Sequence, residues 1–156
     1  AKLGLIMTGR RDVEAGRSVR DRFLKGIPGF KELVAKLDRM YKVSEEKTGK
    51  PYIIALDGRP VFVEGRHKAL NYLLQSFEKI TVALSVTQAM EECDAAGLDW
   101  QPLIVYHDEA NSMVREDQAE QAKEIWLRAF EDAPKQLGAM IMAGDAKIGK
   151  DWYEIH

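Results

Sequence analysis

The stretch PLIVYHDEANSMV, residues 102–114, decides how the second half of this chain folds. Apolar and β-branched residues lead into His107, Asp108 and Glu109, and the chain then returns directly toward apolar residues. Two short strand-like runs on either side of a charged triplet predict a β-hairpin whose tip carries carboxylates. We expect both strands to be buried and Asp108 to be held rigidly at the turn, facing solvent or a ligand.

Asp108 and Glu109 are adjacent carboxylates, and such a pair repels itself unless a cation lies near it. Mg²⁺ suits these oxygen ligands, usually with one or two carboxylates plus waters and substrate phosphates. The pattern alone leaves a second interpretation open, because acidic hairpin tips are also common as plain solvated turns. His107 could be a metal ligand, a partner for a phosphate or sugar, or a turn residue without a task. No second His or Cys ligand set lies nearby, so a zinc site is not expected.

A long helix is expected before this hairpin, over residues 66–96, because the segment has no internal Gly or Pro and Gly97 follows it. His67, Asn71 and Gln75 recur there at i, i+4 and i+8, so they should share one face. Asn and Gln amides can donate to the purine N3 and pyrimidine O2 acceptors that every base pair presents in the minor groove. An ordinary exposed polar helix face would give the same pattern.

Hairpin and helix belong to a longer alternation of elements. Residues 52–63, YIIALDGRPVFV, contain two β-rich runs around an Asp-Gly pair, which a tight two-residue turn favours. Residues 116–132 predict a helix that Pro134 stops, and residues 139–144, AMIMAG, predict a short buried strand. The order hairpin, helix, hairpin, helix, strand indicates an α+β fold whose sheet is covered by helices on one side.

The first third of the chain is expected to be helical and basic. Residues 16–25, GRSVRDRFLK, predict a basic helix, and a second helix with an apolar stripe follows Pro28. That second helix should give way to a loop at residues 44–50, SEEKTGK. Residues 1–50 hold 13 Lys and Arg against 7 Asp and Glu, whereas residues 87–156 hold 6 against 15. This asymmetry indicates a polyanionic partner at the basic end, although two solvated helix faces would also produce it.

Length and composition set the class of protein. A chain of 156 residues with 46% hydrophobic residues suits one compact domain or two small subdomains. It contains no run of eighteen apolar residues, so a membrane span is not expected. The single cysteine, Cys93, cannot form an internal disulfide, which fits a reducing cytoplasm, and it excludes a zinc site built from several cysteines.

Four of these segments occur together in a known family. They resemble, in this order, parts of the C-terminal region of a family A DNA polymerase, the DNA polymerase I family: ALDGRPVFV (55–63), HKALNYLLQS (67–76), VYHDE (105–109) and KIGKDWYEIH (147–156). The resemblance covers nearly the whole chain and is greatest for the podophage replicative branch. It implies an α+β palm subdomain, an antiparallel sheet backed by helices, over residues 51–156, and a helical part of the fingers over residues 1–50.

The resemblance also implies catalytic tasks at the hairpin tip. Asp108 matches the palm carboxylate that coordinates the catalytic Mg²⁺ pair. Glu109 matches the second acid of the same motif, motif C, and lies close to the metals. His107 matches the residue beside the primer 3′ end.

Contacts with DNA are implied for five further residues. Asn71 and Gln75 match the minor-groove probes near the newly formed base pair, and His67 stands where the bacterial branch tends to carry Arg. Arg59 in the first hairpin is expected to meet a phosphate or to pack against the palm. His156 matches a terminal His that returns toward the palm near the primer strand.

The chain departs from the family pattern in ways that matter for assembly. Tyr106 stands where Val is usual, and SFEK follows Gln75 where small residues are usual. The opening, AKLGLIMTG (1–9), resembles the outer fingers just after the nucleotide-binding helix, and that helix, the first palm motif, the thumb and an exonuclease domain are missing from the sequence. Two Mg²⁺ ions need carboxylates from two strands. We therefore expect one piece of a divided polymerase that works on primer-template DNA and dNTPs, in the host cytoplasm if phage-encoded, with a second, larger polypeptide completing its Mg²⁺ site.

A non-catalytic DNA-binding remnant of the same fold is the competing hypothesis. It predicts salt-sensitive DNA binding through the basic first third and no effect of replacing Asp108. The adjacent acids at the hairpin tip argue against a remnant, which has no physical need for clustered carboxylates. A metal-dependent nuclease is not favoured, because the several spread acidic ligands of such sites are missing.

Overall fold

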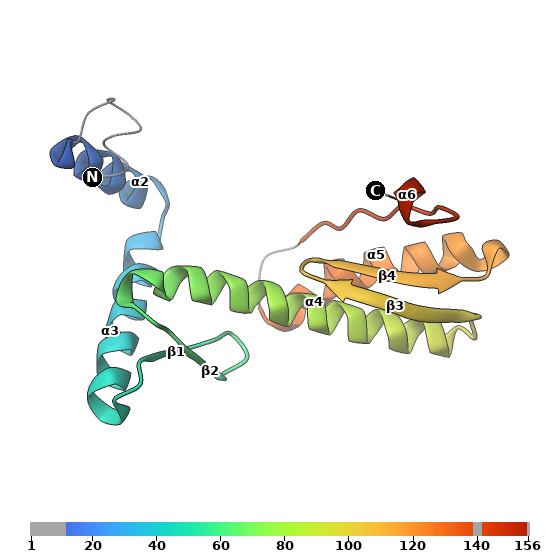
Figure 1. The fold of residues 1–156 in the computed structure, drawn as a ribbon, viewed down its shortest axis with the longest axis horizontal. Helices are drawn as coiled ribbons and strands as arrows, with labels where there is room; N and C mark the ends of the chain where they lie inside the picture. Colours follow the sequence, from blue (N-terminus) through green and yellow to red (C-terminus); the bar gives the residue numbers. More distant parts are fainter. Residues whose placement is uncertain (1–11, 139–141, 156) are drawn as a thin grey trace. The chain divides into compact units, whose positions relative to one another are not determined.

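The computed structural model describes residues 12–138 and 142–155 (Figure 1). The chain forms two compact units. One takes the described residues up to Ile53 together with Phe62–Asn71, and the other takes Ile54–Val61 and the described residues from Tyr72 onward. The described elements are helices and short antiparallel strand pairs, so the expected α+β class is confirmed.

The first unit begins with the basic helix that the sequence predicts. Helix α2, Val13–Gly26, starts at Asp12, whose carboxylate accepts a hydrogen bond of 2.9 Å from the backbone N–H of Ala15. Such a side-chain cap satisfies one of the free N–H groups at a helix start. Near its end, Phe23 packs edge-on against Phe30 of the next helix, with ring centroids 5.5 Å apart.

Helix α3, Phe30–Thr48, is longer than predicted, because residues expected to form a loop continue the helix. Ser44, only 4% exposed, explains the difference. Its hydroxyl accepts from the Tyr52 N–H at 2.8 Å and lies 2.9 Å from the Tyr52 carbonyl oxygen, so it ties the helix to the strand that follows. The helix ends at Gly49, whose φ of +68° provides the left-handed cap.

The first predicted hairpin is confirmed, but its turn differs from the two-residue turn expected. Strands β1, Tyr52–Ile54, and β2, Pro60–Phe62, pair around a longer connection. The Gly58 N–H donates to the Ala55 carbonyl at 3.0 Å, and the Ala55 N–H donates to the Arg59 carbonyl at 2.9 Å. Gly58 takes the positive φ, +86°, and the preceding Asp does not, which is the pattern of a three-residue hairpin loop.

The long helix is confirmed, with one short irregularity at its start. Residues Arg66–Lys68 form the 3₁₀ turn η1, and helix α4 runs from Ala69 to Ala95. Gly97, with φ of +67°, follows its end. Its buried side carries small residues at every fourth position, each at most 1% exposed: Thr81, Ser85, Ala89 and Cys93.

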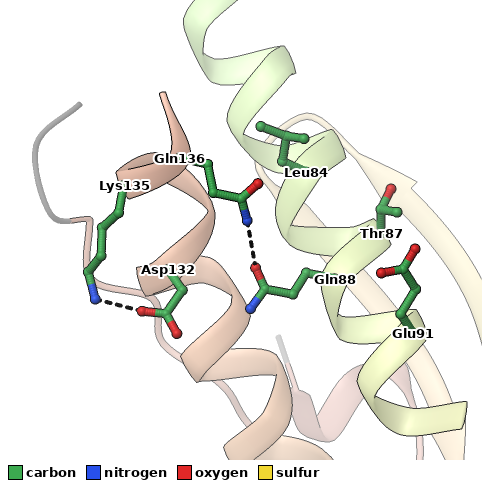
Figure 2. Close-up of a pocket in the computed structure, with 7 residues that line it drawn as sticks. All are labelled: Leu84, Thr87, Gln88, Glu91, Asp132, Lys135 and Gln136. Carbon is green, nitrogen blue, oxygen red and sulfur yellow. Dashed lines mark hydrogen bonds and ion pairs between the residues drawn. The ribbon is translucent and has the colours of Figure 1, made fainter. Parts of the chain in front are cut away.

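Helix α5, Ala119–Gln136, follows the 3₁₀ turn η2, Glu116–Gln118, and lies beside α4 (Figure 2). Gln136 Nε2 donates to Gln88 Oε1 at 3.2 Å, and the Arg128 guanidinium pairs with Glu92. The expected stop at Pro134 is wrong, since the helix contains this residue and ends two positions later. Pro134 is fully buried near the helix end, and this packing offsets the backbone hydrogen bond that proline cannot make.

The second hairpin is confirmed around the quoted stretch. Strands β3, Trp100–Tyr106, and β4, Glu109–Val114, are antiparallel, and their register runs from the pair Trp100–Val114 to the pair Tyr106–Glu109. Trp100 packs edge-on against Trp126 of α5, with ring centroids 6.3 Å apart, so the open end of the hairpin lies on the helix.

The expectation of buried strands is wrong, since no residue of β3 or β4 is buried and β3 is the more exposed strand. Four consecutive apolar residues before the tip are exposed: Leu103, Ile104, Val105 and Tyr106. The described strands form two separate two-stranded sheets, so in this part of the chain no third strand covers β3. Two strands alone cannot shield both faces of each other, which explains the exposure.

The last described residues contain one short helix, α6, Trp152–Ile155. The strand expected over residues 139–144 falls largely outside the described residues, and residues 142–144 are not in a strand. The opening segment, residues 1–9, also lies outside them. Among the helices that the structure describes, none is both long enough and apolar enough to cross a bilayer.

Candidate active site and nucleic-acid interface

His107 and Asp108 form the turn between β3 and β4, and Glu109 is the first residue of β4. Within the described ranges, His107 is the one non-glycine residue with positive φ, +53°. This left-handed conformation is unfavourable for most side chains, and His is among the residues that adopt it more often. The tip thus exposes His107 and Asp108 side by side, with Glu109 half-buried beside them.

Two contacts at the tip were not predicted from the sequence. The Tyr106 ring lies edge-on to the His107 imidazole, with centroids 4.3 Å apart. Asn111 Nδ2 donates to Glu109 Oε1 at 2.8 Å, which holds that carboxylate in place. The second contact could have been predicted, because residues two apart in a strand point to the same face.

Asp108 and Glu109 carry oxygen ligands of the kind that Mg²⁺ prefers. Mg²⁺ commonly takes one or two protein carboxylates and fills its remaining positions with waters and phosphates. Over residues 12–138 and 142–155, no group of three or more His, Cys, Asp or Glu side chains could enclose a metal ion. The donor set at the tip therefore fits one side of a Mg²⁺ site and needs further oxygen ligands.

All three polar residues expected to share one helix face are exposed: His67, Asn71 and Gln75. Asn71 and Gln75 lie one turn apart on α4, as predicted. His67 lies in the 3₁₀ turn before α4, where the rotation per residue is larger than in an α-helix. The direction of the His67 side chain is thus set by the 3₁₀ turn, and it does not follow from α-helical spacing alone.

Arg59 lies in the loop of the first hairpin, where its guanidinium pairs with Asp57. Loss of solvent acts to raise the pKa of Asp57, but the hydrogen bonds from Arg59 outweigh it and lower that pKa. The Arg59 side chain is 64% exposed, so it can reach a phosphate at the cost of this ion pair. His156, the other predicted DNA contact, lies outside the described residues.

A shallow hollow of about 370 Å³ lies between α4 and α5 (Figure 2). It is lined by Leu84, Thr87, Gln88, Glu91, Asp132, Lys135 and Gln136. None of the residues expected to act in catalysis or DNA binding lines it. This hollow is therefore not part of the candidate site.

Known proteins resemble this chain in both sequence and fold. No family model matches it. The DNA-directed DNA polymerase of Enterobacteria phage T3 is 26% identical to it over an alignment of 174 residues, which covers 99% of this chain and 24% of that protein. The DNA-directed DNA polymerase of Escherichia phage T7 is 25% identical with the same coverage. The resemblance to the family A DNA polymerases is confirmed.

A solved polymerase structure shares the fold of this chain. The POL domain of Pol1 from M. smegmatis, solved in complex with DNA primer-template and dNTP, matches 83% of this chain with a TM-score of 0.64 and 15% identity. The chain spans about a quarter of the length of these polymerases. The comparisons assign no task to single residues, so the tasks expected for the hairpin tip and for α4 stay predictions.

Proposed function

We propose that this chain supplies the motif C side of the active site of a DNA-directed DNA polymerase. The observation that carries the proposal is the hairpin tip, which presents Asp108 and Glu109 on a chain whose whole length resembles phage DNA polymerases. The reaction is addition of a dNTP to a primer 3′ end. This reaction is carried out by complete polymerases, and the residues of the hairpin tip would provide one part of their active site.

Asp108 and Glu109 would hold Mg²⁺ from one side. When bound, Mg²⁺ lowers the pKa of the primer 3′-hydroxyl and neutralises the charge that develops on the phosphates. Asp108 would be the main Mg²⁺ ligand because it is exposed at the turn, whereas Glu109 is half-buried and already accepts a hydrogen bond from Asn111. The attacking 3′-oxygen forms a bond to the α-phosphorus, and pyrophosphate leaves from the opposite side.

The DNA is proposed to lie along the exposed polar residues. His107 would lie beside the primer 3′ end, Asn71 and Gln75 would donate to minor-groove acceptors, and His67 and Arg59 would extend the contact. Amide donors test whether a base pair has normal shape without reading its sequence, because the N3 and O2 acceptors are common to all pairs.

Two-metal catalysis also needs a carboxylate from a second strand. We propose that a second, larger polypeptide brings this carboxylate, the nucleotide-binding helix and the thumb. The incomplete donor set at the tip supports this arrangement. The exposed apolar residues of β3 support it as well, because exposed apolar surface of this kind is typical of interaction sites.

Primer extension tests the proposal. The chain is coexpressed with a polypeptide that contains the missing motifs, and incorporation of dNTPs is measured with Mg²⁺. Asp108→Asn should lower the rate by at least a hundredfold, whereas Glu120→Gln, an exposed acid on α5, should leave it unchanged. Extension that is equally fast with Asp108→Asn would refute the catalytic assignment. Full activity of the 156-residue chain alone would refute the need for a second polypeptide.

The competing function is DNA binding without catalysis. It is favoured by the exposed basic residues of α2: Arg17, Arg20, Arg22 and Lys25. In that case the chain binds DNA with an affinity that falls steeply with salt, and Asp108→Asn changes neither binding nor any incorporation rate. Measuring both DNA affinity and the incorporation rate of Asp108→Asn therefore separates the two functions.

A further inference from the structure

We propose that Asp38 is a positioning residue for DNA recognition, acting through Arg66 on the neighbouring His67. The inference rests on the proposed function, because it takes His67 and Asn71 as contacts to the minor groove. It adds a residue of α3 that does not itself touch DNA.

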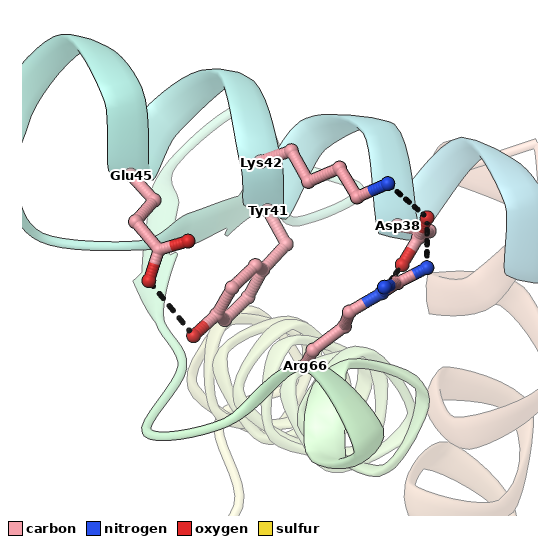
Figure 3. A network of polar contacts seen from close by, with 5 residues as sticks. All are labelled: Asp38, Tyr41, Lys42, Glu45 and Arg66. Carbon is pink, nitrogen blue, oxygen red and sulfur yellow. Dashed lines mark hydrogen bonds and ion pairs between the residues drawn. The ribbon is translucent and has the colours of Figure 1, made fainter.

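An ion pair joins α3 to the turn that begins the long helix (Figure 3). Arg66 donates from Nε to Oδ1 of Asp38 and from Nη2 to Oδ2, the latter at 2.6 Å. Lys42 Nζ lies 3.6 Å from the same Oδ2. Two parallel hydrogen bonds between a guanidinium and a carboxylate fix the plane and direction of both groups, which a single contact would not do.

Arg66, which Asp38 holds in place, is the immediate neighbour of His67, a proposed DNA contact. Arg66 is the first residue of η1 and His67 is the second. A Cβ added at Gly65 would lie 3.2 Å from His67 Cε1, so the imidazole already lies close over the Gly65 backbone. Lys68 Nζ pairs with Glu64 at 2.6 Å across the same turn. The direction of His67 is therefore fixed by the geometry of this turn, and Asp38 is the anchor that comes from another helix.

The location of the pair indicates a role in orientation more than in stability. The side chain of Arg66 is 57% exposed and that of Asp38 is 25% exposed. Ion pairs this open to solvent add little to stability, but they can still select one conformation of a short turn. A 3₁₀ turn of three residues has few internal hydrogen bonds, so contacts from outside the turn help to hold its conformation.

The opposite role for the same residues predicts the opposite change in DNA affinity. If Arg66 contacted a DNA phosphate directly, Asp38 would compete with that phosphate. Removing the carboxylate would then strengthen binding and make it depend more steeply on salt, because one more cation would be free to displace counterions.

The experiment measures dissociation constants for primer-template DNA across a salt series, and incorporation rates, for the full chain together with its complementing polypeptide. Asp38→Asn should weaken binding about two- to fivefold, the range that an exposed ion pair can transmit, with an unchanged salt slope. His67→Ala should also weaken binding, and the double variant should bind no worse than His67→Ala alone. Asp38→Glu, which keeps the carboxylate, should restore most of the affinity.

The matched control is Asp117→Asn. Asp117 accepts two hydrogen bonds from Arg115 at 2.6 and 3.0 Å, and its side chain, 66% exposed, is more open to solvent than that of Asp38. This variant should leave binding and incorporation unchanged. Arg66→Lys provides a second test that keeps the charge and removes the two-bond geometry, and it should act like Asp38→Asn even if the latter folds poorly.

Three outcomes would overturn the inference. They are tighter binding by Asp38→Asn with a steeper salt slope, additive effects in the double variant, or wild-type binding by both Asp38→Asn and Arg66→Lys. In the third case a wild-type protein that binds and extends DNA would leave the proposed function intact. A wild-type protein that neither binds nor extends primer-template DNA would refute the proposed function itself.

Discussion

His107 adopts a backbone conformation that few side chains accept, at the point where the proposed catalytic residues meet. A φ of +53° is needed there because only the two residues His107 and Asp108 connect the paired residues Tyr106 and Glu109. Short hairpin connections favour residues that tolerate positive φ. The position of the carboxylates therefore depends on the residue before them as well as on the acids themselves.

Replacing His107 separates its backbone task from its chemical task. His107→Asn should preserve stability, because Asn accepts the left-handed conformation. His107→Val should lower the free energy of unfolding by about 1–2 kcal/mol, because a β-branched residue clashes there. Unfolding in urea measures the free energy of unfolding of both variants. Equal stability of the two variants would show that this φ is not required at the tip.

At the level of elements, Ser44 decides where α3 ends and how β1 follows. Ser44→Ala should cost about 1–3 kcal/mol of stability, because the Tyr52 N–H would lose its acceptor in a buried place. The Tyr52 amide should also exchange with deuterium faster. Thr87→Ala is the matched control, since the exposed Thr87 hydroxyl donates to the Ala83 carbonyl of its own helix, α4. An unchanged exchange rate at Tyr52 in Ser44→Ala would contradict the assigned role.

These elements also show which parts of the fold and site the sequence could predict. The hairpins and the long helix follow from local signals, namely turn residues and a 3.6-residue apolar period. The continuation of α3 past Ser44 and of α5 through Pro134 depends on tertiary contacts, which local patterns do not contain. The same holds for the site. The hairpin tip was predictable, whereas the pair Asp38–Arg66 joins residues 28 positions apart and leaves no periodic trace.

For the molecule as a whole, ion pairs set the direction of its response to acid. Hydrogen bonds from a cationic side chain lower the pKa of Asp57, as described above, and of three further exposed or half-buried carboxyl groups: Glu64, Glu92 and Asp117. Each such group contributes stability above its pKa in the unfolded chain, and this contribution is lost as the pH falls through the lower pKa of the folded state. The four effects have the same sign, so acid should weaken the fold.

Glu92 offers the clearest test of this response, because its carboxylate joins α4 to α5. The Arg128 guanidinium, followed by the Gln88 amide, lowers the pKa of Glu92 below its usual value. Glu92→Gln should therefore reduce stability at pH 7 and flatten the loss of stability below about pH 4.3, the usual pKa of a free glutamate. Thermal unfolding between pH 7 and pH 3 measures the difference. Parallel curves for both proteins would show that this pair does not contribute.

The small-residue side of α4 has one practical consequence. Cys93 is completely enclosed there, and burial, together with the nearby Asp94 and Glu92 charges, raises the pKa of its thiol. A thiol reagent can react with it only after the segments packed against this side of α4 separate from it. The labelling rate of the natural protein would thus report how often that separation occurs, without any introduced probe.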